Sequence, residues 1–366
     1  MFKIWAIGLN LCALAILLCT MSPATLAQES GAQVDQPASA VQEGASEALF
    51  PMFKTGGTWG YMNSSGETVI PPQFDDAMPF SEGLAAVYIR GTQAGQYGMT
   101  TTGGWGYIDT TGKTVIEPKY VQATGFFEGL VAVYNGTAWG YVNNAGEVAI
   151  PCDYVRAGRF SEGLAPVTKL TRYGFIDKAG VMAIDVRFDA TWGFTEGLAA
   201  VNVGGEWGYV DHAGDTVIEP QFFAARAFSE GLAAVEVIDK WGYVDQSGNM
   251  VIAPQFDAAA SFSDGLAPVL VGEDWGFVDT AGNVVISPQY KRALPFSEGL
   301  AAAQVKERLN DWGYIDKDGN WIIQPDFHVA ESFQNGLAWV EFGNLRFGYI
   351  DKTGNYVWGP VAETWR

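Results

Sequence analysis

Residues Gly231–Pro254 read GLAAVEVIDKWGYVDQSGNMVIAP. The stretch contains three short runs rich in β-branched and aromatic residues, Leu232–Ile238, Trp241–Asp245 and Met250–Ile252, and turn residues separate them. Short runs bounded by turns predict an antiparallel meander of three strands. Pro254 has no N–H to donate to a neighbouring strand, so we expect the third strand to end there.

The Trp-Gly pair of this stretch recurs along the whole chain. It occurs at Trp59, Trp105, Trp139, Trp207, Trp241, Trp275 and Trp312, and Tyr173-Gly174 and Phe347-Gly348 occupy two further positions of the series. Successive positions are 46, 34, 34, 34, 34, 34, 37 and 35 residues apart. A fixed period of this size predicts a repeat architecture. A residue pair that recurs in every repeat indicates a structural role rather than a catalytic one.

A second signature, Phe-Ser-Glu-Gly-Leu-Ala, accompanies the first. It occurs at Phe80, Phe160, Phe228 and Phe296, with variants at Phe127, Phe194, Phe262 and Phe333. We expect the Phe to be a core residue between units, and the Ser and Glu to cap a tight turn. In the Asp-x-x-Gly turn, such as Asp245–Gly248, the Asp side chain can accept backbone N–H bonds and the Gly supplies a positive φ.

Together, the pattern Trp-Gly-Tyr-[Ile/Val]-Asp-x-x-Gly, the following Ile-x-Pro and the Phe-Ser-Glu-Gly-Leu-Ala signature resemble the bacterial WG (KWG) β-repeat family. The resemblance covers about residues 48–360. It implies a β-rich repeat protein, often exported, in a group whose functions are mostly uncharacterised. The resemblance supplies no catalytic residues.

Two β architectures accommodate such units, a closed propeller and an open array. A propeller blade usually has four strands and about 40 or more residues, so a period of 34 is short. The first unit has a leading strand, Leu49–Met52, before Trp59, and the last completes its third strand at Tyr356–Trp358. We therefore expect an all-β tandem array of nine three-stranded antiparallel units, open or superhelical. A closed propeller-like ring is the alternative.

The first residues have the features of a secretory signal. Lys3 precedes the apolar run Ile4–Leu18, and Thr25-Leu26-Ala27 offers a small-residue cleavage site. We expect a signal peptide over residues 1–27, a disordered acidic and polar tether over 28–47, and the WG-type repeat domain over 48–366. The mature protein is then periplasmic or extracellular, with no stable membrane span. A membrane tether through an uncleaved signal or a lipidated Cys19 is the alternative.

Charge and composition exclude several classes of ligand and catalytic site. A formal charge of -20 repels nucleic acid and anionic lipid. The chain has only two histidines, His212 and His328, and Cys152 is the only cysteine after signal cleavage, so we expect neither nucleophilic catalysis nor a zinc site. We expect Cys152 to be a buried structural thiol and His212 to be a solvated turn residue.

The recurring glutamates of the second signature are candidate glycosidase acids, because glycosidases use two carboxyl groups. Their repetition argues against that role, as do Asp264 and Asn335 at the same position, because a catalytic acid needs a unique environment. We therefore expect no enzyme, no cofactor and no metal site.

Departures from the repeat mark candidate binding surfaces. One is the insertion between Arg90 and Gly103, which contains Tyr97, and another is the insertion Lys306–Leu309. Late in the chain, large aromatic residues replace smaller strand residues at Trp321, Trp339 and Trp358. Aromatic surface can stack sugars or anchor a protein partner, although an end cap is an alternative role.

These observations predict an exported, non-catalytic β-repeat protein that serves as a binding scaffold for a protein or cell-envelope partner. Polysaccharide is a possible ligand and nucleic acid is not. A carbohydrate-binding protein or glycoside hydrolase is one alternative, and a structural spacer is another.

Overall fold

The computed structural model describes residues 48–362, apart from residues 55–56, 92, 95–98, 101–102, 307–310 and 344–345. All described residues lie in Ser46–Arg366, the second of two units into which the chain divides. The expected signal peptide and tether lie outside the described residues, as does Tyr97.

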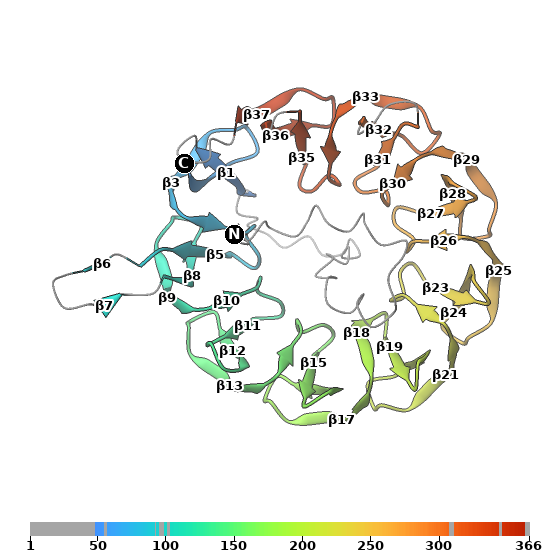
Figure 1. The fold of residues 1–366 in the computed structure, drawn as a ribbon, viewed down its shortest axis with the longest axis horizontal. Coiled ribbons are helices and arrows are strands. Elements are labelled where there is room, and N and C mark those ends of the chain that lie inside the picture. The colour runs from blue at the N-terminus through green and yellow to red at the C-terminus, as the bar shows by residue number, and fades with distance from the viewer. Residues whose placement is uncertain are drawn as a thin grey trace, which may run out of the picture. The chain divides into compact units, whose positions relative to one another are not determined.

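The described residues form nine small antiparallel sheets that follow one another round a closed ring (Figure 1). Blade 1 has three strands in the described part of the chain, and blades 2 to 9 have four. The expectation of an open or superhelical array was therefore wrong. The fold is a nine-bladed β-propeller, which was the alternative.

Blades 2 to 9 each begin with a short strand on the inner side of the ring (Figure 1). These inner strands are β4 (Asp76–Ala77), β10 (Gln122–Ala123), β14 (Arg156–Ala157), β18 (Ala190–Thr195), β22 (Ala224–Ala225), β26 (Ala258–Ala259), β30 (Arg292–Ala293) and β34 (Val329–Ala330). The second strands of the blades are β1 (Phe50–Lys54), β5 (Leu84–Ile89), β11 (Leu130–Tyr134), β15 (Leu164–Lys169), β19 (Leu198–Val203), β23 (Leu232–Val237), β27 (Leu266–Val271), β31 (Ala301–Gln304) and β35 (Leu337–Phe342).

The third and fourth strands complete each meander. The third strands are β2 (Thr58–Met62), β8 (Gly104–Asp109), β12 (Trp139–Asn143), β16 (Arg172–Asp177), β20 (Glu206–Val210), β24 (Lys240–Asp245), β28 (Asp274–Asp279), β32 (Trp312–Ile315) and β36 (Arg346–Asp351). The outer strands are β3 (Thr68–Phe74), β9 (Thr114–Tyr120), β13 (Val148–Tyr154), β17 (Met182–Phe188), β21 (Thr216–Phe222), β25 (Met250–Phe256), β29 (Val284–Tyr290), β33 (Trp321–Phe327) and β37 (Tyr356–Ala362). A separate hairpin, β6 (Gln93–Ala94) and β7 (Met99–Thr100), lies between β5 and β8.

The inner strand explains why a period of 34 residues suffices for a propeller blade. In blade 7 it consists of Ala258 and Ala259, which pair with Leu270 and Val269 of β27. Two residues are too few to show the alternation by which a strand is recognised in sequence. The segment between the three predicted strands of one unit and those of the next therefore contributes a fourth strand to blades 2 to 9.

The outer strand does not end at its proline, contrary to expectation. β25 continues through Pro254 to Phe256, with register shifts against β24 that mark a bulge. A Cβ on Gly242 would lie 2.4 Å from the Ile252 carbonyl oxygen and 2.8 Å from the Pro254 nitrogen. The glycine of the Trp-Gly pair is therefore required by the close approach of the bulged outer strand.

Each blade packs on the next through a buried aromatic pair. The Tyr243 hydroxyl of blade 6 donates a 2.8 Å hydrogen bond to the Ala260 carbonyl of blade 7, and its ring centroid lies 4.8 Å from that of Phe262. Both side chains are buried, which confirms the Phe of the second signature as a core residue between units. In blade 3 the core residue is Phe126, which packs on Tyr107, so the assignment of Phe127 to that role was wrong.

The Asp-x-x-Gly turn forms a second contact between blades. Asp245 Oδ1 accepts backbone N–H bonds from Ser247 and Asn249, both 2.9 Å long, as expected. Gly248 has a φ of +84°, and a Cβ there would lie 3.4 Å from the Ile218 side chain of the preceding blade. The turn of each blade thus rests on the outer strand of the blade before it.

The same contact joins blade 1 to blade 9 and closes the ring. A Cβ on Gly66 of blade 1 would lie 2.3 Å from the carbonyl oxygen of Val357 in blade 9. Phe50 of blade 1 and Tyr349 of blade 9 have ring centroids 5.6 Å apart, inside one buried cluster. Among the described residues, closure uses side-chain packing and no strand exchange between the two ends.

The closing contact predicts a difference between two glycine substitutions in blade 1. Gly66 and Gly57 both have positive φ, but a Cβ on Gly57 would meet nothing within 4 Å. Gly66→Ala should therefore lower the free energy of unfolding by about 1–3 kcal/mol more than Gly57→Ala, because only it forces blades 1 and 9 apart. Urea denaturation measures both values. Equal losses in the two variants would contradict the closed ring.

The buried tyrosines predict the response to alkali. Burial raises the pKa of these phenols above the ordinary value of about 10, and it does so most strongly for Tyr61, Tyr107, Tyr141, Tyr209, Tyr243 and Tyr314. The folded state keeps these protons while the unfolded chain releases them, so stability is fully present below about pH 10 and is lost above it. Absorbance at 295 nm should therefore rise for these residues only as the far-ultraviolet circular dichroism of the sheets disappears. Complete tyrosine ionisation with unchanged dichroism would refute this.

Candidate functional site

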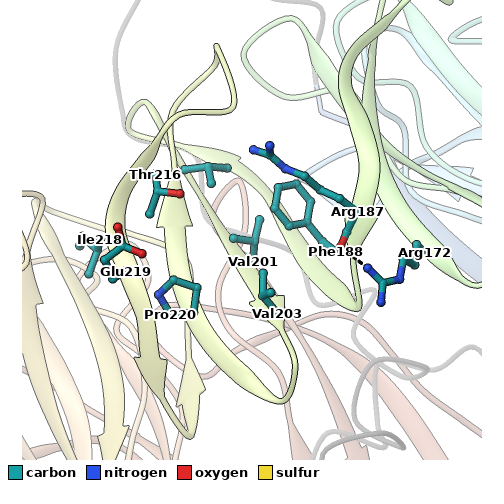
Figure 2. Close-up of a pocket in the computed structure, with 10 residues that line it drawn as sticks. Arg172, Arg187, Phe188, Val201, Val203, Thr216, Ile218, Glu219 and Pro220 are labelled. Carbon is teal, nitrogen blue, oxygen red and sulfur yellow. Dashed lines mark hydrogen bonds between the residues drawn. The ribbon is translucent and has the colours of Figure 1, made fainter.

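A cavity of about 430 Å³ lies where blade 4 meets blade 5 (Figure 2). Arg172, Arg187 and Phe188 of blade 4 line one side, and Val201 and Val203 of blade 5 line the other. Tyr173 packs on the adjoining core at the position where most repeats have Trp. The contact between blades 4 and 5 therefore contains residues that differ from those of the other repeats.

The Phe-Ser-Glu-Gly signature forms a two-residue hairpin turn. Ser161 and Leu164 exchange backbone hydrogen bonds of 2.9 and 3.1 Å, and Glu162 and Gly163 between them both have positive φ. A glutamate is seldom found in this conformation, so its repeated presence requires another contact to compensate.

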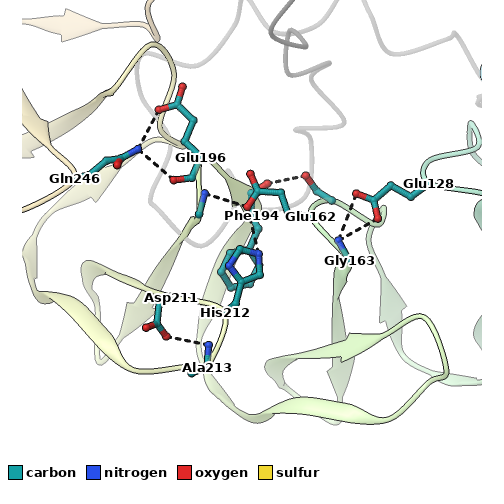
Figure 3. Close-up of polar contacts among 11 residues, drawn as sticks. Glu128, Glu162, Gly163, Phe194, Glu196, Asp211, His212, Ala213 and Gln246 are labelled. Atoms are coloured by element: carbon teal, nitrogen blue, oxygen red, sulfur yellow. Dashed lines mark hydrogen bonds and ion pairs between the residues drawn. The ribbon is translucent and has the colours of Figure 1, made fainter. Parts of the chain in front are cut away.

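That contact is a carboxylate bond to the next blade, which we call the inter-blade clamp (Figure 3). Glu128 of blade 3 accepts a 3.0 Å bond from the Gly163 backbone N–H of blade 4, and Lys178 of blade 4 lies 3.0 Å from the same carboxylate. In blade 4, Glu162 accepts a 3.0 Å bond from Gly197 of blade 5. The same backbone contact joins Glu82 to Gly129, Glu196 to Gly231, Glu230 to Gly265, Asp264 to Gly299 and Glu298 to Gly336.

The clamp gives the recurring carboxylates a structural role. Asp264 makes the same contact as the glutamates, with a distance of 2.7 Å to the Gly299 nitrogen. The serine of the signature adds to it, since the Ser229 hydroxyl donates a 2.8 Å bond to the Phe262 carbonyl of the next blade. The expectation that Ser and Glu cap their own turn was therefore incomplete, because their side chains bind the following blade.

His212 takes part in a clamp and is not simply a solvated turn residue. Its Nε2 lies 3.3 Å from Glu162 Oε2, and its ring stacks on Phe194 with centroids 4.3 Å apart. His328 is exposed and its backbone N–H donates to the Glu341 carbonyl. Cys152 is partly buried, and burial raises the pKa of its thiol, which disfavours the reactive thiolate.

The aromatic residues singled out in the sequence lie in blades 8 and 9. Trp321 is partly buried and packs edge-on against Tyr290. Trp339 and Trp358 are also partly buried and pack on Phe347 beside the cluster that joins blade 9 to blade 1. The structure therefore places these two tryptophans at the closing seam.

Exposed apolar side chains occur in pairs at one end of two blades, a feature that sequence reasoning missed. In blade 6, Phe223 is 61% exposed and Ile238 is 77% exposed. In blade 4, Val155 and Leu170 are 56% and 87% exposed. The Phe223 backbone N–H donates to the Glu236 carbonyl, which places the incoming segment beside the hairpin between the second and third strands.

We call this side of the ring, with Val155, Leu170, Phe223 and Ile238, the hairpin end. The two hairpin residues are strained, with φ of 57° at Leu170 and 48° at Ile238. A positive φ is unfavourable for a bulky or β-branched side chain and costs on the order of 1–2 kcal/mol. Strain of this kind marks a candidate functional position.

Other blades have a polar arrangement at the same positions. In blade 5, Asp189 Oδ2 accepts a 2.7 Å bond from the Gly204 backbone N–H, and in blade 7 Asp257 does the same for Gly272 at 2.6 Å. Phe223 and Val155 replace this aspartate in blades 6 and 4. The loss of the aspartate together with an apolar hairpin residue is the sequence signal that could have located the hairpin end.

Two other features are absent from the described residues. No cluster of three or more His, Cys, Asp or Glu side chains there is arranged to hold a metal ion. That part of the chain also contains no helix with the length and apolarity needed to cross a membrane.

Solved structures with this fold include a eukaryotic initiation factor, which is 14% identical, with a TM-score of 0.61 over 88% of this chain and 98% of that one. The computationally designed Ika8 protein is 10% identical with a TM-score of 0.44, covering 76% and 93%. BamB from Moraxella catarrhalis is 11% identical with a TM-score of 0.40, covering 64% and 80%. The first of these supports the propeller fold.

No curated protein matches the chain. The model of the WG containing repeat matches residues 59–92, 105–136, 139–169, 173–207, 207–241, 241–273, 275–308 and 312–345. The matched segments cover most of the described ring and begin at the Trp-Gly positions or their Tyr-Gly equivalent. The chain therefore belongs to the family of proteins with WG-containing repeats.

Proposed function

We propose that the ring is an exported, non-catalytic scaffold that binds a partner protein of the cell envelope through its hairpin end. The observation that carries this proposal is the pair of exposed apolar residues on a strained hairpin, Phe223 with Ile238, and its counterpart in blade 4. Export rests on the signal-like sequence of residues 1–27.

Energetics favour a binding role for these residues. Exposed apolar side chains at adjacent positions mark interaction surfaces more often than scattered ones do. Ile238 also holds a conformation that glycine or asparagine adopts more easily, and Gly204-Gly205 occupies the same hairpin in blade 5. The chain thus keeps an apolar side chain where a more stable alternative exists, which is typical of residues that bind a partner.

Ile238→Asn tests the proposal, because it should raise stability and abolish binding together. Asparagine relieves the positive-φ strain, so we expect the free energy of unfolding to rise by about 0.5–1 kcal/mol. We also expect a partner that is cross-linked to the wild-type chain in intact envelopes, and identified by mass spectrometry, to be lost from this variant and from Phe223→Ser.

Val285→Thr is the matched control, because Val285 is 45% exposed on the outer strand β29, away from the hairpins. It should retain the partner. Retention of the same partner by Ile238→Asn and Phe223→Ser would count against the hairpin end as the binding surface.

A further inference from the structure

The seam between blades 4 and 5 has a charge that sets it apart from the rest of the molecule. The chain has a formal charge of -20. Residues 156–188, which form blade 4, nevertheless contain six basic residues against three acidic ones. The basic residues are Arg156, Arg159, Lys169, Arg172, Lys178 and Arg187, and the acidic residues are Glu162, Asp177 and Asp185. Blade 4 is therefore a basic blade in an acidic protein.

Two of these basic residues line the cavity described above. Figure 2 shows the guanidinium groups of Arg172 and Arg187 extending in different directions, with the Phe188 ring between them in this view. Val201 is buried and Val203 is 43% exposed on the opposite side. The cavity thus has an apolar lining, and the two positively charged guanidinium groups lie on different sides of that lining.

Both guanidinium groups are held in place mainly by neutral partners. Arg172 Nη1 donates a 3.1 Å bond to the Arg187 carbonyl, and its Nη2 is 3.7 Å from Asp189 Oδ1. Arg187 Nη2 donates to the Gly214 carbonyl, and its guanidinium carbon lies 5.0 Å from the Phe188 ring centroid. Arg187 forms no salt bridge with any described carboxylate, so its charge is available to a ligand.

No equivalent arrangement occurs in the three blades that follow. The position of Arg187 in the outer strand is occupied by Gln221, Gln255 and Gln289 in blades 5, 6 and 7. These blades have Trp at the position of Tyr173. The basic cavity is therefore a local departure from the repeat.

We propose that this cavity binds a short acidic segment of a partner protein, in which an apolar side chain is flanked by carboxylates. The apolar side chain lies against Val203, which is 43% exposed above the buried Phe188 and Val201, and the carboxylates pair with Arg172 and Arg187. A peptide fits better than a single small anion because the two positive groups lie on different sides of an apolar surface. Glu219 lines the blade 5 side, so the acidic flanks of the segment lie toward blade 4.

This site adjoins the hairpin end, because Arg172 follows Leu170 by two residues, but it uses other side chains and its test does not depend on the proposed function. The probe is a fluorescein-labelled peptide, Gly-Asp-Glu-Phe-Glu-Asp-Gly, titrated with the full chain at low salt and followed by fluorescence anisotropy. Two further peptides replace its acidic residues with lysine or its phenylalanine with glycine. We expect the acidic peptide with phenylalanine to bind, and both replacements to weaken binding at least tenfold, since charge-assisted bonds and apolar contact both contribute.

Substitutions in the cavity then locate the site. Arg172→Ser and Arg187→Ser should each weaken peptide binding about tenfold, because each removes one charge-assisted contact. Val203→Glu adds a negative charge at an exposed position and should abolish binding without altering either arginine. Arg187→Ser also removes a hydrogen bond to blade 5, whereas Val203→Glu leaves that bond in place and therefore tests the cavity independently.

Lys240→Ser is the matched control, because Lys240 occupies the position of Arg172 in blade 6, where Gln255 replaces Arg187. This variant loses the same charge and should bind the peptide as the wild-type chain does. Absence of binding by the acidic peptide, equal binding by the lysine peptide, or unchanged binding in Arg172→Ser and Val203→Glu would each overturn the inference.

Discussion

Contact between neighbouring blades is the constraint on which the rest of this structure depends. A single blade is a small sheet that cannot bury its apolar face alone, and each blade completes the core of the next. Three contacts recur at the seams: a buried Tyr or Phe on the following Phe, an Asp-x-x-Gly turn on the preceding outer strand, and a carboxylate on the following turn. The glutamate conformation, unfavourable in isolation, persists because its side chain is bound across the seam.

Repetition of these contacts also explains where function can lie. Residues that follow the repeat are committed to the seams, so a binding surface requires positions that the seams leave free. The hairpin end meets this condition at Leu170 and Ile238, and the basic cavity lies at a seam where Arg187 departs from the residue that the repeat has there. Both surfaces lie in blades 4 to 6. The hairpin end is apolar and its backbone is strained, whereas the cavity is basic.

Much of the repeat unit was predictable from sequence because its determinants are local. Asp245, Gly248 and Phe262 have the roles that the sequence pattern indicated. Ring closure was not predictable, because the inner strand has only two residues in most blades and the closing pair Phe50 and Tyr349 lies at opposite ends of the array. The hairpin end was missed for a similar reason. Ile238 looked like the last residue of a strand, whereas β23 ends at Val237 and Ile238 occupies the turn.

A double-mutant cycle between Phe50 and Tyr349 tests ring closure most directly, because their rings are 5.6 Å apart in the ring and far apart in any open array. Phe50→Leu, Tyr349→Leu and the double variant are compared with the wild-type chain by urea denaturation. A closed ring predicts a coupling free energy of about 0.5–1.5 kcal/mol, the value typical of an aromatic pair in contact. Additive effects within about 0.3 kcal/mol would show that blades 1 and 9 do not meet.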